Sequence, residues 1–330
     1  MLHLRDKTLF PPVFLAPLAG ITDLPFRTLV ARFGAGLVVS EMVASQDMVL
    51  SKRGVREKTE LGCDVENTAV QLAGCEPHWM AEAARQVEAS GARVIDINMG
   101  CPAKKVTSSS GSGASGSALM KNLDHALRLI DAVVGAVRVP VTLKTRLGWD
   151  DTLLNAPVLA KRAEAAGVRM ITIHGRTRCQ FYKGYADWGA IRAVKDAVNI
   201  PVIANGDITG VAEARQALQR SGADGVMIGR GAQGRPWILA QVSAALFGTP
   251  APTVPEDAEF VRMVQDHYEA ILSFYGRELG TRVARKHLGW YMDTAGTPTG
   301  LRKLVLTAGN PADVLHLLDD ALLVPGRSAA

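Results

Sequence analysis

Eight short apolar segments, separated by stretches with helical periodicity, limit the folds open to this 330-residue chain more than any other feature. The segments are Val13–Ala16, Leu37–Ser40, Ala69–Leu72, Val94–Asn98, Val141–Thr145, Met170–His174, Val202–Asn205 and Gly225–Ile228. Each is a nearly continuous apolar run, which is typical of parallel strands buried on both faces. Eight strand–helix units within residues 1–248 match the number and size of the units in a TIM (β/α)8 barrel. We therefore predict an α/β fold of this type.

An open, doubly wound α/β sheet is the structural alternative. Such sheets usually have fewer strands, and many carry a G-x-G-x-x-G fingerprint after the first strand. In this chain the first strand is followed by Ala16-Pro17-Leu18-Ala19-Gly20, which lacks that fingerprint. The sequence therefore favours the closed barrel.

A second domain is predicted after the Pro/Gly-rich segment Gly248-Thr249-Pro250-Ala251-Pro252. Beyond it, apolar residues follow helical spacing over Asp257–Tyr275 and Gly280–Met292, and two shorter helical segments reach about Leu323. Helices of this number and length pack as a small bundle. We predict a barrel domain over residues 1–248 and an all-α helical-bundle domain over residues 253–330, with a frayed end.

The composition excludes several classes of protein. No apolar run reaches the roughly 18 residues that a bilayer span needs, and the mixed, charged segment Met1–Phe10 does not resemble a secretory signal. The four cysteines, Cys63, Cys75, Cys101 and Cys179, do not follow zinc-site spacing. We therefore expect a cytoplasmic protein with free thiols, without a metal and without membrane association.

The net charge of +5 allows a polyanionic partner without demanding one. Residues 1–252 carry 29 Lys and Arg against 22 Asp and Glu, whereas the remaining residues carry 8 against 10. If the protein binds nucleic acid, most of the attraction is expected from the barrel.

Polar or small residues stand at the end of nearly every predicted strand. They are Pro17-Leu18, Ser40-Glu41, Gln71, Asn98 with Cys101, Lys144 with Arg146, His174 with Arg176, Asn205-Gly206-Asp207 and Gly229-Arg230. Packing does not explain so regular a set, because buried polar groups cost free energy unless they are paired. In a TIM barrel these ends meet at one rim, where the active site lies. The sequence therefore predicts a site at that rim.

The last two strand ends resemble a phosphate site. Gly206 and Gly229 allow backbone N–H groups to approach an anion closely, and the loops after strands seven and eight of a TIM barrel often bind phosphate. Arg176 and Arg230 add positive charge. The alternative is that these glycines only form tight turns.

Two further strand ends have competing interpretations. Lys144 lies in an apolar stretch and needs a partner, which an electron-rich cofactor ring can supply; the alternative is a Schiff-base lysine. His174 is interpreted as a hydrogen-bond donor to a cofactor or as a structural histidine. Gln71 is suited to bind a planar heterocycle.

Cys101 lies in Asn98-Met99-Gly100-Cys101-Pro102, directly after a strand. A free cysteine is most often a small buried hydrophobe, but Pro102 and the polar loop that follows favour exposure at the rim. The Ser/Gly-rich segment Thr107–Ser117 cannot bury apolar surface, so we expect a mobile loop there. It is either a lid or a tolerated insertion.

Taken together, these motifs resemble those of the tRNA-dihydrouridine synthases over almost the whole chain. The motifs are Ala16-Pro17-Leu18-Ala19-Gly20-Ile21-Thr22-Asp23, Gln71-Leu72-Ala73-Gly74, Asn98-Met99-Gly100-Cys101-Pro102-Ala103-Lys104-Lys105-Val106, Gly116-Ser117-Ala118-Leu119, His174-Gly175-Arg176-Thr177, Ile203-Ala204-Asn205-Gly206-Asp207-Ile208 and Met227-Ile228-Gly229-Arg230-Gly231-Ala232. The lysine pair and the tail motif Arg285-Lys286-His287…Trp290-Tyr291 resemble the bacterial B-type branch, also described as nitrogen-regulation proteins. The segment between Val106 and Gly116 is longer here than in that family.

The resemblance implies an FMN cofactor across the mouth of the barrel. Its contacts would come from Pro17, Leu18, Ala19, Gln71, Lys144, His174, Asn205, Gly206, Asp207, Gly229 and Arg230. Cys101 would be the catalytic acid. Asn98, Arg176 and Tyr182 are candidates for holding the target uracil, and Arg282, Arg285 and Lys286 for holding tRNA phosphates. Lys104, Lys105, Arg146, Arg178 and Lys183 would extend this basic track along the rim.

The implied reaction is an oxidoreduction of the uridine C5–C6 double bond in the tRNA D-loop. NADPH (or NADH) reduces the flavin, FMN N5 gives hydride to C6, and Cys101, as a thiol, gives a proton to C5. Besides tRNA, no obligate protein partner is expected. The alternatives are an FMN-dependent dehydrogenase of a free pyrimidine, which needs no helical tail, and a non-enzymatic regulator, which needs neither Cys101 nor flavin.

Overall fold

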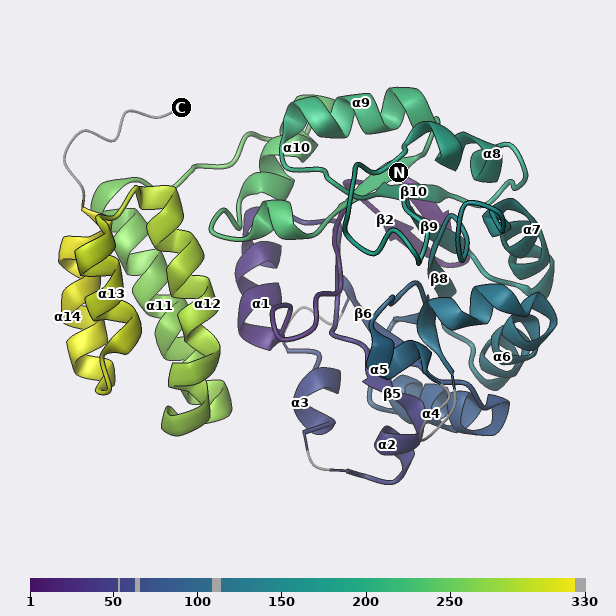
Figure 1. Cartoon of the computed structure of the whole chain (residues 1–330), viewed down its shortest axis with the longest axis horizontal. Helices are drawn as coiled ribbons and strands as arrows, with labels where there is room; N and C mark the ends of the chain where they lie inside the picture. Colours follow the sequence, from purple (N-terminus) through teal and green to yellow (C-terminus); the bar gives the residue numbers. More distant parts are fainter. Residues whose placement is uncertain (53, 63–65, 109–113, 324–330) are drawn as a thin grey trace.

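The computed structural model describes residues 1–52, 54–62, 66–108 and 114–323. Figure 1 shows a barrel with helices around it and, beside it, a bundle formed by the C-terminal part of the chain. Cys63, part of the Ser/Gly-rich segment and the C-terminal end, on which expectations were stated, lie outside the described residues.

Eight parallel strands close into the barrel. They are β3 (Val13–Leu15), β4 (Leu37–Val39), β6 (Thr68–Ala73), β7 (Val94–Met99), β8 (Val141–Arg146), β9 (Met170–His174), β10 (Val202–Asn205) and β11 (Gly225–Ile228). Each pairs with the next in chain order, and β11 pairs with β3, so the sheet has no free end within this set. The predicted TIM barrel is confirmed, with strand ends within two residues of those expected from the sequence.

Three short strands were not predicted from the sequence. β5 (Val43–Ala44) lies beside β6, and β1 (Leu2–Leu4) and β2 (Lys7–Leu9) form an antiparallel hairpin. Leu4 and Leu9 are fully buried in one cluster with inward-facing barrel residues such as Phe14. The hairpin therefore closes the end of the barrel opposite the predicted rim. Runs of two or three residues are too short to show a period, which is why the sequence did not reveal them.

The helices and 3-10 turns of the barrel domain follow from amphipathic patterns in the loops between strands. They are α1 (Leu24–Phe33), α2 (Ser45–Val49), α3 (Arg56–Thr59), α4 (Pro77–Ala89), α5 (Lys104–Thr107), η1 (Gly116–Lys121), α6 (Leu123–Ala136), α7 (Ala156–Ala166), η2 (Gly189–Ile191), α8 (Arg192–Lys195), α9 (Val211–Ser221), η3 (Arg230–Ala232) and α10 (Ile238–Phe247). In α6, for example, Leu129, Ile130 and Val133 repeat at helical spacing and are fully buried. Each such side chain contributes roughly 1.5–3 kcal/mol by its burial. The Asn122 side chain accepts from the His125 N–H and caps this helix.

The C-terminal bundle consists of α11 (Asp257–Tyr275), α12 (Arg277–Ala295), α13 (Thr299–Thr307) and α14 (Pro311–Leu322). These helices have a hydrophobic cluster of their own, which includes Phe260, Tyr291 and Leu318. Trp237, which precedes α10, belongs to this same cluster. The bundle therefore packs beside the barrel, with α11 against α1.

Among the described residues, none of the helices combines the length and the apolar character that crossing a membrane requires.

Candidate active site at the mouth of the barrel

A cavity of about 620 Å³ opens at the carboxyl ends of the barrel strands. All of the side chains proposed for the cofactor line it: Pro17, Leu18, Ala19, Gln71, Lys144, His174, Asn205, Gly206, Asp207, Gly229 and Arg230. Cys101, Asn98 and Tyr182 line it as well, whereas Arg176, Arg282, Arg285 and Lys286 do not. Residues far apart in the sequence converge here because every parallel strand ends at the same rim.

A buried hydrogen-bond chain across three strands forms the floor of the site. Gln71, Asp96 and Thr142 are direct partners in the register of β6, β7 and β8. The Thr142 hydroxyl donates to Asp96 Oδ1 (2.6 Å), and Gln71 Nε2 donates to Asp96 Oδ2 (2.7 Å). Asn98 Nδ2 then donates to Gln71 Oε1 (2.7 Å). This chain fixes which end of the Gln71 amide is donor and which is acceptor.

Asp96 was absent from the candidate residues. Burial raises the pKa of its carboxyl group, while hydrogen bonds from Gln71 and Thr142 and the charge of Lys144 act in the opposite direction. A signal was available in the sequence: Asp96 stands two residues before Asn98, so on a strand both point to the same side.

Hydrogen bonds hold both the N–H and the C=O group of the Cys101 backbone. Asn98 Oδ1 accepts from the backbone N–H groups of Gly100 (3.2 Å) and Cys101 (3.0 Å). The Cys101 carbonyl accepts from the Ser117 N–H (3.0 Å) and hydroxyl (2.8 Å). At Gly116, a Cβ would lie 2.8 Å from the Cys101 carbonyl oxygen. Cys101 is half-buried and lines the cavity, so it is not the fully buried hydrophobe of the alternative interpretation.

Lys144 forms a hydrogen bond with Asn205. Its Nζ donates to Asn205 Oδ1 (3.0 Å), and Asn205 Nδ2 donates to the Met227 carbonyl (2.8 Å). Burial and the neighbouring charge of Arg146 lower the pKa of Lys144 to about 8, although Asp96 and Cys101 act against this shift. The Lys144 ammonium is therefore charged below about pH 8, and an anion placed beside it would favour this charged form.

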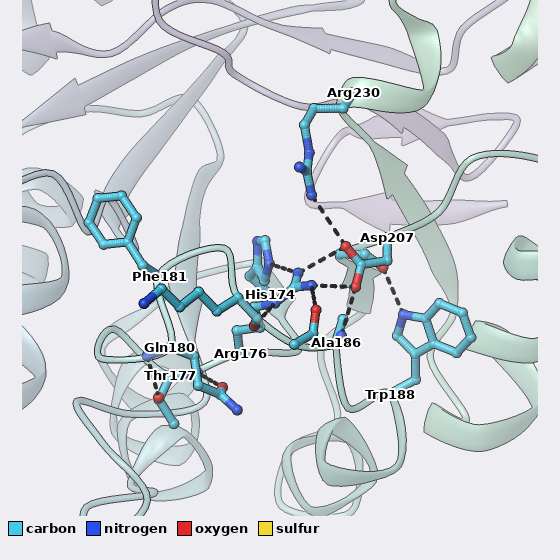
Figure 2. Close-up of polar contacts among 12 residues, drawn as sticks. His174, Arg176, Thr177, Gln180, Phe181, Ala186, Trp188, Asp207 and Arg230 are labelled. Carbon is cyan, nitrogen blue, oxygen red and sulfur yellow. Dashed lines mark hydrogen bonds and ion pairs between the residues drawn. The ribbon is translucent and has the colours of Figure 1, made fainter.

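A buried arginine joins the ends of β9 and β10, as Figure 2 shows. Arg176 is 2% exposed and donates from two nitrogens to the two carboxylate oxygens of Asp207, at 2.9 and 2.5 Å. Its remaining donors reach the carbonyls of Lys183 (3.1 Å) and Gly184 (2.7 Å) and the Nε2 atom of His174 (3.3 Å). Arg176 does not line the cavity and its donors are engaged by these partners, so its contact with the uracil stays a prediction that this geometry does not favour.

His174 takes a defined role from this arrangement. Burial, together with the nearby charges of Arg146 and Lys144, lowers the pKa of His174 well below 6.5, so the ring is neutral. Since Nε2 lies against an Arg176 donor, it must act as the acceptor, and Nδ1 carries the proton. The ring can therefore donate one hydrogen bond from Nδ1.

The turn after β10 contains Gly206 and Asp207, and the Asp207 side chain lies close to two arginines. Gly206 and Asp207 have positive φ angles of 116° and 52°, and a Cβ at Gly206 would lie 2.8 Å from the Ala186 Cβ. Partial burial raises the pKa of Asp207, but hydrogen bonds from Arg176 and Ala186 and the charge of Arg230 lower it overall. The Asp207 carboxylate therefore binds these cations (Figure 2), and the contact that it leaves for an anion is its backbone N–H.

The C-terminal residues proposed for RNA lie on α12, outside the cavity. Arg282, Arg285 and Lys286 are exposed. Arg282 lies 3.5 Å from Glu278 in an ion pair, and Lys286 Nζ lies 3.5 Å from the carbonyl oxygen of Gly20. Lys286 therefore places this cationic helix beside the segment that follows β3 and lines the mouth.

Two buried carboxylates lie beneath that segment: Glu41, a predicted strand-end residue, and Asp23, to which sequence analysis gave no role. Glu41 accepts from the Gly20 N–H, and Asp23 accepts from the Phe26 N–H (3.0 Å) at the start of α1. Burial, and to a smaller extent the charge of Glu41, raises the pKa of Asp23 to about 6, although the hydrogen bond from the Phe26 N–H and the neighbouring Tyr275 side chain of α11 act against this shift. These buried carboxylates connect the mouth to the bundle.

Within the part of the chain that the structure describes, no three His, Cys, Asp or Glu side chains gather as they would around a metal ion.

The comparisons with known proteins give one consistent result. Residues 14–323 match the family model described as dihydrouridine synthase (Dus). A protein named "Probable tRNA-dihydrouridine synthase" from Rhodobacter capsulatus is 64% identical over 97% of this chain and 97% of its own length. A protein of the same name from Rickettsia conorii is 54% identical over 90% of this chain and 88% of its own, and "tRNA-dihydrouridine synthase B" from Xanthomonas campestris pv. campestris is 46% identical over 97% and 95%.

Among solved structures, a histamine dehydrogenase from Rhizobium sp. 4-9 is similar with a TM-score of 0.54 and 11% sequence identity. The match covers 81% of this chain and 50% of that protein, so this chain spans about half its length. At such low identity the likeness concerns the fold alone.

Proposed function

The chain belongs to the dihydrouridine synthase family, and from that premise we propose that it reduces uridine to dihydrouridine in the D-loop of tRNA, with FMN as cofactor and NADPH or NADH as reductant. The observation that carries the proposal is the convergence of Cys101, Lys144 and His174 on one cavity at the barrel mouth. A proton donor, a cation and a neutral donor ring are the groups that reduction of a planar heterocycle requires.

The lining of the cavity fits FMN in size and in polarity. A volume of about 620 Å³ falls within the range of roughly 300–1,000 Å³ that is usual for cofactor sites. A Cβ at Gly229 would point toward Leu18 and Ala16, so the glycine leaves this side of the cavity open. No hydrogen bond among the described residues uses the backbone N–H of Gly206, Asp207, Gly229 or Arg230. These groups suit a phosphate.

When bound, FMN would supply the hydride chemistry of the reduction. Lys144 would stabilise negative charge on the bound cofactor, and His174 would donate to it from Nδ1. Gln71 presents its free Nε2–H, since its other amide proton is held by Asp96. Each group acts from a position fixed by a buried partner.

Cys101 donates the proton that uracil C5 requires. Its backbone is held by Asn98 and Ser117, so the thiol is placed without reorganisation during the reaction. Asn98 lines the same cavity, but its amide is engaged with Gln71 and the Cys101 loop, so its main contribution is to position Cys101. Tyr182 remains the candidate contact to the uracil ring.

The RNA itself is held outside the cavity. The exposed cations of α12 suit phosphates, and the target base must leave the folded RNA to enter the cavity. We assign the barrel, residues 1–248, to catalysis and the bundle, residues 253–330, to binding of tRNA. A cytoplasmic location follows from this substrate.

The test is an absorption spectrum of the purified chain, followed by anaerobic addition of NADPH and then of tRNA that lacks dihydrouridine. We expect flavin bands that bleach with NADPH and recover only with that tRNA, and dihydrouridine by mass spectrometry of the RNA. Recovery with free uracil or orotate instead of tRNA would indicate a dehydrogenase of a free pyrimidine. Protein that cannot be loaded with FMN would refute both functions.

A further inference from the structure

The loop after β9, residues 177–185, exposes three aromatic side chains at the mouth of the barrel. Phe181 is 37% exposed, Tyr182 is 52% exposed and Tyr185 is 90% exposed. Large aromatic rings are usually buried, so three exposed rings within five residues mark a surface for a partner. Tyr182 lines the cavity, which places this loop at its rim.

Two buried guanidinium groups hold the backbone of the loop. Arg146 donates from Nη1 to the carbonyls of Thr177 (3.0 Å) and Phe181 (2.8 Å). Arg176 donates to the carbonyls of Lys183 (3.1 Å) and Gly184 (2.7 Å), and both arginines are 2% exposed. Hydrogen bonds from these two arginines thus hold four carbonyls within eight residues, so the backbone that carries the exposed rings is rigid.

Phe181 has a φ angle of 58°, in the left-handed region that a bulky residue rarely adopts. Such a conformation persists only where the surrounding contacts impose it, and here the Arg146 bond to the Phe181 carbonyl does so. In Figure 2 the Phe181 ring points away from the Arg176–Asp207 network. The strained backbone therefore directs an apolar ring outward.

We propose that Phe181 and Tyr185 form a stacking surface for unpaired nucleobases of the RNA that neighbour the base in the cavity. This inference rests on the RNA substrate proposed above. Extruding one base leaves its neighbours without a stacking partner, and every nucleobase has a π face that an aromatic ring can cover.

The charges around the loop favour RNA over an apolar partner. Lys183 lies between the two rings in sequence and is exposed. The guanidinium groups of Arg146 and Arg230 lie 5.6 and 5.7 Å from the centre of the Tyr182 ring. Cations interleaved with aromatic rings are the combination that binds single-stranded nucleic acid.

The experiment measures the affinity of the FMN-loaded full chain for tRNA lacking dihydrouridine, by fluorescence anisotropy over a series of salt concentrations. Phe181→Ala and Tyr185→Ala should each weaken binding roughly tenfold, because one stacking contact is lost. The slope of log affinity against log salt should not change, because no phosphate contact is removed. Tyr185→Phe keeps the ring and should bind like the parent.

Three further variants separate stacking from other effects. Lys183→Ala should lower the salt slope by about 1, as expected for a phosphate contact. Phe181→Gly removes the ring but accepts the positive φ, so it should lose as much affinity as Phe181→Ala if the ring matters rather than the backbone. Leu304→Ala removes an exposed apolar side chain on α13 and should leave the affinity unchanged.

The outcomes distinguish the two proposals. If Phe181→Ala and Tyr185→Ala bind tRNA with the same affinity as the parent, the stacking surface is refuted while the proposed function stands. If Phe181→Gly binds like the parent, the Phe181 ring is not a contact. If the parent itself shows no affinity for tRNA, the proposed function fails and this inference fails with it.

Discussion

At the scale of single residues, the site depends on polar groups that hold one another in place. Cys101 has its N–H and C=O bound by Asn98 and Ser117, and Asn98 is oriented in turn by Gln71 and Asp96. A side chain is useful for proton transfer only if it stays within hydrogen-bond reach of the reacting atom. The predictions at this scale therefore concern the acid, its support and the charge beside the cofactor.

Replacing Cys101 with Ala should leave FMN binding and NADPH oxidation intact and lower dihydrouridine formation by about 10²–10⁴-fold, the usual contribution of a positioned proton donor. Single-turnover reoxidation of the reduced flavin by tRNA measures this step. Cys101→Ser places a less acidic donor in the same position, so its rate of dihydrouridine formation should lie between those of the parent and of Cys101→Ala. Turnover of the Ala variant equal to that of the parent would contradict the acid role.

Replacing Asp96 with Ala should destabilise the protein by about 2–4 kcal/mol, because it leaves the donors of Thr142 and Gln71 buried and unpaired. Urea unfolding followed by circular dichroism gives this value. Asp96→Asn is the informative companion: its amide can donate toward Gln71, so Gln71 would turn its oxygen toward position 96 and an acceptor would replace the Nε2–H that now faces the cavity. We expect a shifted flavin absorption spectrum and weaker FMN binding, whereas an unchanged spectrum would argue against control of Gln71 by Asp96.

The lowered pKa of Lys144 leads us to expect that cofactor binding depends on pH. Its pKa in the free protein is lowered to about 8, so the ammonium is present below that pH and is lost above it. A negative group bound beside Lys144 favours the charged form, so FMN should bind more weakly as the pH rises through 8, with proton uptake on binding above it. Titration of FMN by fluorescence quenching from pH 6 to about 10 tests this. The Lys144→Met variant should bind weakly with a flat profile; a flat profile for the parent would contradict the assignment.

At the scale of secondary-structure elements, the strands set the chemistry and the loops set access to it. Strand register alone brings Gln71, Asp96 and Thr142 into one row and pairs Asn98 with Lys144. The loop after β9, in contrast, takes its shape from Arg146 and Arg176, which reach it from neighbouring strand ends. An element's role at this site thus follows from its neighbours as much as from its own sequence.

The helix α12 carries the exposed cations proposed for RNA. Arg285→Ala together with Arg282→Ala should weaken tRNA binding and lower the slope of log affinity against log salt by about 1.5–2, as for the loss of two phosphate contacts. NADPH oxidation in the absence of RNA should not change. Lys303→Ala, an exposed cation on α13, serves as the matched control. A salt slope equal to that of the parent would show that these two arginines do not bind phosphate.

At the scale of the whole molecule, barrel and bundle are joined by aromatic contacts. The ring of Phe26 in α1 lies 5.8 Å from that of His267 and 5.0 Å from that of His287. The ring of Trp237, which directly precedes α10, lies 6.1 Å from that of Phe33 and 5.9 Å from that of Phe260. These buried contacts fix the cationic helix α12 relative to the mouth (Figure 1), which a flexible linker would not achieve.

Trp237→Ala should therefore lower the free energy of unfolding by about 3–5 kcal/mol, as expected for loss of a fully packed aromatic side chain. It should also weaken tRNA binding more than FMN binding, because the bundle loses its fixed position while the cavity keeps its lining. Denaturant unfolding and the two affinities are the measurements. A loss of stability below about 1 kcal/mol would mean that the barrel and bundle pack without help from this ring.

The sequence by itself predicted the barrel, the helical bundle and the cavity-lining residues proposed for the cofactor. Apolar runs at regular spacing report strands buried on both faces, and parallel strands of one barrel must end at the same rim. Gln71, Lys144, His174 and Asn205 could thus be placed at one site from their positions at strand ends. The physical reason is that periodicity and strand direction are local properties of the chain.

Only the tertiary structure decided which strand-end groups face the cavity and which support it. Arg146 and Arg176 both stand at strand ends in the sequence. Arg146 lines the cavity, whereas Arg176 is buried under the loop after β9 and forms an ion pair with Asp207. Asp96 gained its role from partners on two other strands, and Lys286 gained its place beside Gly20 from the docking of the bundle. Side-chain direction beyond a strand end depends on the path of the loop and on long-range partners, and these contacts exist only after the strands have assembled.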